Sequence, residues 1–158
     1  MEKLILAILY WLHLLATVTW IGGIIFVLFV ALPSAKEVLG TDAGKMMTAV
    51  TKRFTPLANY SILLLVLTGV ALTVLSERFT GVGTLNTAWT IALVLKHFLV
   101  LVMILVHFYR GLVLAPKIVR RTFTTEKASL QKLSLNLVKV NFVLGIGVLL
   151  LSGVTSVI

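Results

Sequence analysis

The residues of this chain best suited to metal chemistry are two histidines, His13 and His97, each inside a long run of apolar residues. Each is followed 56 residues later by a glycine, Gly69 or Gly153, which stands between a hydroxyl residue and a valine. An imidazole is costly to place in hydrocarbon, so it is expected to have a partner or a function there. The matched positions predict two related helical hairpins, each of which contributes one imidazole to a metal site.

The elements that must position these histidines are four apolar segments, at about residues 4–32, 57–75, 88–115 and 133–158. Each is long enough to cross about 30 Å of hydrocarbon as a helix. With 59% hydrophobic residues and a mean hydropathy of +1.11, the composition excludes an ordinary soluble domain. We expect an all-α membrane protein with a single transmembrane domain over residues 1–158, a four-helix transmembrane bundle made of two pseudo-repeated helical hairpins. Pro33 and Pro116 are expected to close the two histidine segments.

The net charge of +9 is concentrated in two of the three connections. Basic residues gather in loops 33–56 and 116–132, whereas the turn over residues 79–87 is uncharged. By the positive-inside rule, both basic loops are cytoplasmic and both termini lie outside. Each histidine then lies about nine residues into its helix, roughly 14 Å from the outer end. This distribution suits a lipid membrane with anionic headgroups and argues against a nucleic-acid partner.

Two neutral imidazoles on facing helices are suited to the iron of a haem. The absence of cysteine removes thiolate ligands and iron–sulfur clusters. Thr17 and Trp20 follow His13 on the same helix face, and Gly69 and Gly153 would let the backbone approach a flat macrocycle. The alternative is that each histidine forms only a hydrogen bond between helices.

Further along the third segment lie other residues that could take part in binding. Lys96 precedes His97, and the apolar segments offer it no carboxylate, so a haem propionate would be a suitable partner unless the lysine extends to the headgroups. Met103 and His107 are one turn apart and could bind a soft ion such as Cu(I). Otherwise His107 could ligate a second haem, with Arg110 meeting its propionates.

Several motifs resemble those of a known membrane family. The run His13-Leu-Leu-Ala-Thr-Val-Thr-Trp20-Ile-Gly-Gly23, then Ala31-Leu-Pro33, Arg53-Phe54 and Leu67-Thr-Gly-Val70, resembles the CopD-like (copper-resistance D) family. The same superfamily includes HemJ-type proteins, which are linked to protoporphyrinogen oxidation and bind haem b. The resemblance therefore implies either copper uptake or haem-dependent redox work. This chain has no Met-rich or His-rich outer stretch, and it has a second histidine, which favours haem.

We therefore predict a membrane-integral b-type cytochrome that holds haem b between His13 and His97 at the outer side of the cell membrane. It would transfer electrons to or from a quinone, an external redox protein or a small oxidant, with haem-dependent oxidoreductase activity as an open question. One alternative is a copper transport or resistance permease of the CopD type that uses Met103, His107 and the pair Met46-Met47. Another is a HemJ-like protoporphyrinogen oxidase. A homodimer through glycines such as Gly145 and Gly147 is also open.

Overall fold

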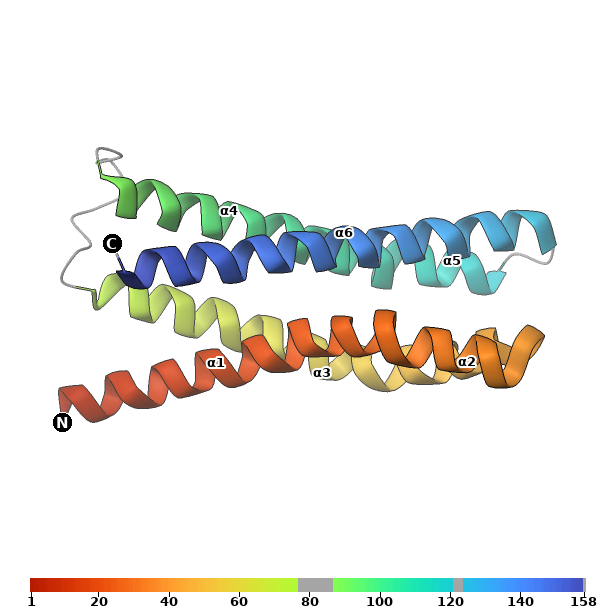
Figure 1. The fold of residues 1–158 in the computed structure, drawn as a ribbon, viewed down its shortest axis with the longest axis horizontal. Coiled ribbons are helices and arrows are strands. Elements are labelled where there is room, and N and C mark those ends of the chain that lie inside the picture. The colour runs from red at the N-terminus through yellow and green to blue at the C-terminus, as the bar shows by residue number, and fades with distance from the viewer. Residues whose placement is uncertain (77–86, 121–123, 158) are drawn as a thin grey trace. The chain divides into compact units, whose positions relative to one another are not determined.

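The structure is a computed structural model, and it describes residues 1–76, 87–120 and 124–157. Every regular element in these ranges is a helix, as Figure 1 shows, which confirms the all-α prediction. Contacts divide the chain into two compact units, Met1–Gly81 and Val82–Ile158. Each unit has its own pair of long helices packed side by side.

The first unit is a long helix that turns and packs against a second long helix. α1 (Glu2–Phe26) continues through a π-helical turn, η1 (Val27–Ala31), into α2 (Leu32–Leu39). A short 3-10 helix, η2 (Gly40–Asp42), leads into α3 (Ala43–Val74), which runs back along α1 (Figure 1). Gly40 has φ +51°, a conformation that costs a glycine little, and it allows the chain to reverse there.

The second unit repeats this order of elements. α4 (Ala88–Phe108) continues through a π-helical turn, η3 (Tyr109–Leu114), into α5 (Ala115–Arg120), and α6 (Thr124–Val157) packs against α4. Thr87 caps α4, because its hydroxyl oxygen accepts a hydrogen bond from the Thr90 backbone N–H at 3.2 Å. Between the two long helices, the buried Asn141 amide donates to the Met103 carbonyl at 3.2 Å.

The prediction that two prolines end the histidine helices is wrong. Pro33 and Pro116 both lie within continuous helix, each just after a π-helical turn. A proline lacks the backbone N–H of its own turn, and its ring clashes with the carbonyl four residues earlier. A wider π turn ahead of the proline relieves that clash without ending the helix. The prolines therefore mark a local change in helix width at the same point of each unit.

The predicted segment bounds 57–75 and 133–158 are too short, because α3 begins at Ala43 and α6 at Thr124. Pro56 lies inside α3, and the basic stretches 33–56 and 116–132 are largely helical within the described residues. The hydropathy pattern locates the apolar part of each helix, whereas lysine and arginine are good helix formers that extend it. Of the predicted turn over 79–87, only Thr87 lies inside the described residues.

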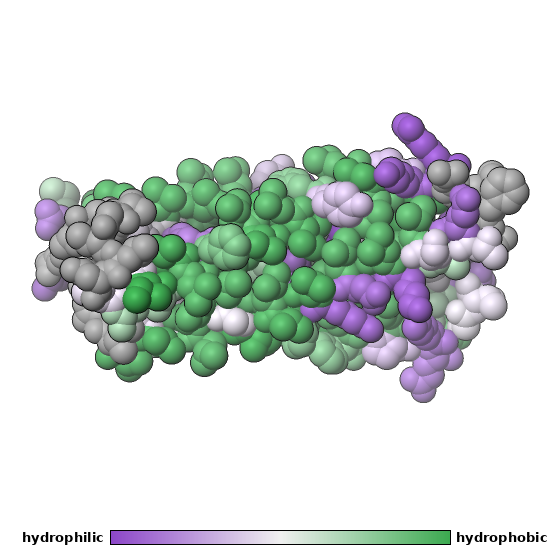
Figure 2. All heavy atoms as spheres, turned by 90° about the horizontal axis from the view of Figure 1, so that it is seen from above, coloured by the Kyte–Doolittle hydropathy of each residue, from purple (hydrophilic) through white to green (hydrophobic). Residues whose placement is uncertain are grey.

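Within the described residues, three helical segments are long and apolar enough to cross a membrane: Glu2–Val74, Ala88–Arg120 and Thr125–Val157. The first of these segments contains both long helices of its unit, because helical structure continues almost without a break from α1 to α3. Bulky apolar side chains such as Leu14 (61% exposed) and Val18 (69%) lie on the surface, and Figure 2 shows a face on which hydrophobic side chains predominate. A surface of this kind is characteristic of a protein in a lipid membrane.

One glycine suggested for a dimer contact has a different role within its unit. A Cβ placed on Gly147 of α6 would lie 3.4 Å from a methyl group of Leu99 on α4. Gly147 therefore faces the neighbouring helix of its own unit.

A Gly23→Ala substitution is expected to loosen the packing of α1 on α3, because the added Cβ would overlap the ring of Phe54. Overpacking of this kind costs about 1–3 kcal/mol. The matched control is Gly22→Ala, since no atom lies within 4 Å of a Cβ at that position. Melting of the detergent-solubilised variants provides the comparison, and equal stability of both alanine variants would contradict the close Gly23–Phe54 packing.

Candidate functional site

His13 on α1 is held by a hydroxyl of the neighbouring helix. Its Nδ1 atom lies 2.8 Å from Oγ1 of Thr68, a residue of α3 that is 2% exposed. The same Thr68 oxygen lies 2.6 Å from the backbone carbonyl oxygen of Leu64. The three groups form a short hydrogen-bond chain from an imidazole on α1 to the backbone of α3.

This hydrogen-bond chain fixes the direction of each bond within it. A carbonyl oxygen only accepts, and Thr68 has a single hydroxyl hydrogen, which it donates to Leu64. The Thr68 oxygen must then accept from His13, so the Nδ1 atom carries the proton. In the neutral imidazole the lone pair is therefore on Nε2, the atom that would bind a metal.

Of the other residues expected around the His13 ring, Gly69 lies beside it, whereas Thr17 bonds to the backbone. A Cβ on Gly69 would lie 3.4 Å from the His13 Cε1 atom, so the absence of a side chain at Gly69 leaves space beside the ring. The Thr17 hydroxyl donates to the His13 backbone carbonyl at 2.8 Å, and therefore does not serve the imidazole. Trp20 is buried, at 2% exposure, on the same helix.

His97 on α4 is assigned the same tautomer, but its hydrogen-bond acceptor lies on its own helix. Its Nδ1 atom lies 2.7 Å from the backbone carbonyl oxygen of Leu93, one turn earlier. Because that carbonyl can only accept, His97 donates its Nδ1–H, and Nε2 again carries the lone pair. The residue is exposed on its helix. Both histidines thus present Nε2, one held by a neighbouring helix and the other by its own.

The pattern that surrounds His13 is not reproduced around His97. Ser152, which occupies the place of Thr68 in the spacing, donates to the Val148 carbonyl at 2.8 Å. A Cβ on Gly153 would meet no atom within 4 Å, whereas one on Gly69 would touch His13. The matched spacing therefore identifies equivalent positions but does not dictate equivalent contacts.

Lys96 and Arg110, the two cationic residues expected to meet a ligand, lie in different elements of the second unit. Lys96 is half-buried on α4 and forms no ion pair with any described residue. Arg110, in η3, donates from its Nε atom to the Ser134 hydroxyl on α6 at 3.2 Å. The anion that the sequence suggests for Lys96 is therefore not supplied by the described part of the protein.

Met103 and His107 share a face of α4, one turn apart. Met103 is 1% exposed, and its carbonyl accepts the Asn141 amide. The rings of His107 and Phe108 form a T-shaped pair, with centroids 5.5 Å apart. Among the described residues, no group of three or more histidines or acidic residues is close enough to hold a metal ion.

Thr68 contacts His13, and the sequence alone assigned it no role. The tripeptide Thr68-Gly69-Val70 marks its position, but the interpretation of that motif rested on the glycine. A threonine ahead of a small residue, 55 positions from a membrane histidine, is a signal for an interhelical hydrogen bond that could have been used.

The sequence matches the model of a known protein family. A family model described as copper resistance protein D matches residues 48–155, which include Thr68 and His97 and exclude His13. No curated protein and no solved structure gave a match.

A Thr68→Val substitution is expected to remove the acceptor of the His13 N–H while conserving the side-chain shape. The unmet donor should cost about 1–3 kcal/mol and release the imidazole to sample both tautomers. Nitrogen NMR of labelled histidine measures the tautomer directly. The control is Thr73→Val, because the Thr73 hydroxyl donates to the Gly69 carbonyl and is not bonded to His13. A His13 signal that is unchanged in Thr68→Val, or altered equally by both variants, would contradict the assigned tautomer.

Proposed function

The chain belongs to the copper resistance protein D family, and on that premise we propose that it binds copper in the membrane through His13 and His97. The observation that carries the proposal is that each Nδ1 atom lies 2.7–2.8 Å from an oxygen acceptor, which assigns the proton of the neutral imidazole to Nδ1 and its lone pair to Nε2. Histidines that ligate metals characteristically donate their other ring N–H to an oxygen acceptor, which orients the ring. Neutral imidazole is a good ligand for copper.

Copper in this proposal is the cargo of the protein, taken up by the imidazoles and passed on as part of copper resistance or transport. In His13 the acceptor is a side-chain oxygen on a second helix, so the orientation of the ring depends on the packing of α1 against α3. In His97 the acceptor belongs to the same helix turn. The protein needs no oxidation step for this function, because imidazole binds and releases the ion by ligand exchange.

The topology of the proposal is a four-span bundle of two pseudo-repeated hairpins. Two observations support it: each unit has the same order of long helix, π turn, short helix and long helix, and the π turn precedes a proline in both. By the positive-inside rule, the distribution of basic residues favours an outer position for both termini and both histidines. The basic ends, residues 33–56 and 116–132, then lie in the cytoplasm.

Haem b held by His13 and His97 is the second candidate. His13 and His97 would be the residues that hold it through Nε2, and Gly69 adds no side chain beside the His13 ring. Bound there, haem would supply a one-electron redox centre. Copper ranks ahead of haem because the matched family is described by copper resistance and not by haem.

Copper binding by purified protein tests the proposal. Cu(I) affinity is measured by competition with a coloured chelator for the wild type, His13→Ala, His97→Ala and the double variant. We expect each single variant to weaken binding by at least tenfold and the double variant to abolish it, since each removes a ligand atom. His107→Ala and Met103→Leu are the control variants, because they remove the alternative candidate ligands on α4. Both should retain wild-type copper affinity. Loss of copper in these two variants, with retention in the double histidine variant, would overturn the proposal.

The absorbance spectrum of the same preparations separates copper from haem. A colourless protein that binds copper through His13 and His97 is the expected result. A low-spin b-type spectrum that disappears in both His13→Ala and His97→Ala would instead establish haem as the ligand of these residues.

A further inference from the structure

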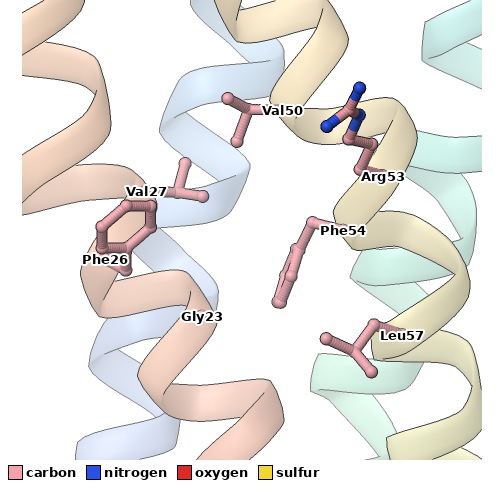
Figure 3. A pocket seen from close by; sticks show the side chains of 7 residues that line it. All are labelled: Gly23, Phe26, Val27, Val50, Arg53, Phe54 and Leu57. Carbon is pink, nitrogen blue, oxygen red and sulfur yellow. The ribbon is translucent and has the colours of Figure 1, made fainter.

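The first unit contains a groove that the proposed copper function does not use. It has a volume of about 290 Å³ and lies between α3 and the part of α1 that leads into η1. Its lining is apolar except for one guanidinium (Figure 3), and consists of Gly23, Phe26, Val27, Val50, Arg53, Phe54 and Leu57.

The groove exists because a glycine and an aromatic ring meet there. The ring of Phe54 reaches from α3 toward the backbone of Gly23, where a Cβ would overlap it (Figure 3). Val27 is the first residue of the π turn η1. π turns occur frequently at functional sites, since they alter the helix surface locally. The shape of the groove is therefore built by specific residues of both helices.

Arg53 is the charged residue at this groove. It is exposed, and it forms no hydrogen bond or ion pair with any described residue. In Figure 3 Arg53 and Val50 lie toward one end of the groove and Leu57 toward the other. The charged end is therefore the one nearer the basic start of α3, and the apolar end lies deeper along the helix.

We propose that this groove binds an anionic phospholipid, with its phosphate at Arg53 and part of one acyl chain along Phe54 and Leu57. A guanidinium binds phosphate in a bidentate manner, and Arg53, which no other described residue engages, is available for it. The volume is near the lower limit of ligand sites, roughly 300 Å³, which fits a segment of one chain rather than a whole lipid.

The lining selects a lipid over a soluble anion. A free phosphate would bind to the guanidinium alone, and the apolar side chains would add nothing to its binding free energy. An acyl chain would bury these side chains, which is favourable. The surrounding charge also favours an anionic headgroup, because Lys52 precedes Arg53 and the carboxylate of Asp42 is already paired with Lys45 at 2.8 Å. Anionic lipids of the cytoplasmic leaflet are attracted to basic segments in this way.

Native mass spectrometry of the detergent-solubilised protein tests the proposal with phosphatidylglycerol and phosphatidylcholine as probes. We expect one phosphatidylglycerol to be retained in preference to phosphatidylcholine, and Arg53→Gln to weaken its retention about tenfold, the effect of losing one charge-assisted contact. Lys52→Gln is the matched control, because it removes the same charge one residue away from the lining. Val50→Trp, which fills the groove from α3, should also remove the bound lipid.

Three results would overturn the proposal. Equal weakening by Arg53→Gln and Lys52→Gln would indicate general attraction to a basic surface. Equal retention of phosphatidylcholine would show that the guanidinium does not select the headgroup. Displacement of the lipid by millimolar inorganic phosphate would show that the groove contributes nothing. Since none of these measurements involves copper, the result is independent of the proposed function.

Discussion

The hydrogen-bond chain from His13 through Thr68 to the Leu64 carbonyl is the interaction on which the first unit depends. It joins α1 to α3 through side chains, and it determines which imidazole nitrogen carries the proton. In a hydrocarbon environment no water can accept a hydrogen bond from an unpaired donor. Loss of this bond is therefore expected to cost more free energy than loss of a similar bond on a solvated surface. The same bond thus contributes to packing and prepares the Nε2 atom for a ligand.

Features that depend on hydrophobicity and spacing are predicted well from the sequence. Apolar segments predict helices, and the matched positions of His13 and His97 correspond to equivalent places in two units of the same element order. Helix ends are predicted poorly. Pro33 and Pro116 are strong stop signals in a sequence, yet the backbone accommodates each with a wider turn. Basic residues around Lys45 extend α3 because helix formation depends on the backbone and not on solubility in lipid.

Contacts are harder to predict than positions. Thr68 and Ser152 occupy equivalent places, but only Thr68 meets the histidine of its unit. The two hydroxyls are alike in chemistry, so the difference comes from what lies beside each of them in its own unit. A glycine follows both hydroxyl residues, yet only Gly69 lies beside a histidine ring, so the face that each helix turns toward its neighbour decides the contact. That face is not encoded in the spacing alone, which explains why the sequence identified the glycine and missed the threonine.

The two histidines differ in which helix provides the hydrogen-bond acceptor that orients the ring. For His13 this acceptor lies on α3, one of the two helices that form the groove. His97 is oriented by a carbonyl of its own turn, so the state of its ring is local to α4. His13 is oriented by α3, and the groove lined by Gly23 and Phe54 lies between the same two helices. A lipid bound in the proposed groove would contact the same two helices that bring Thr68 to the His13 ring. The orientation of the His13 ring and the shape of the groove therefore depend on the same packing of α1 against α3, whereas the orientation of the His97 ring depends on its own helix turn.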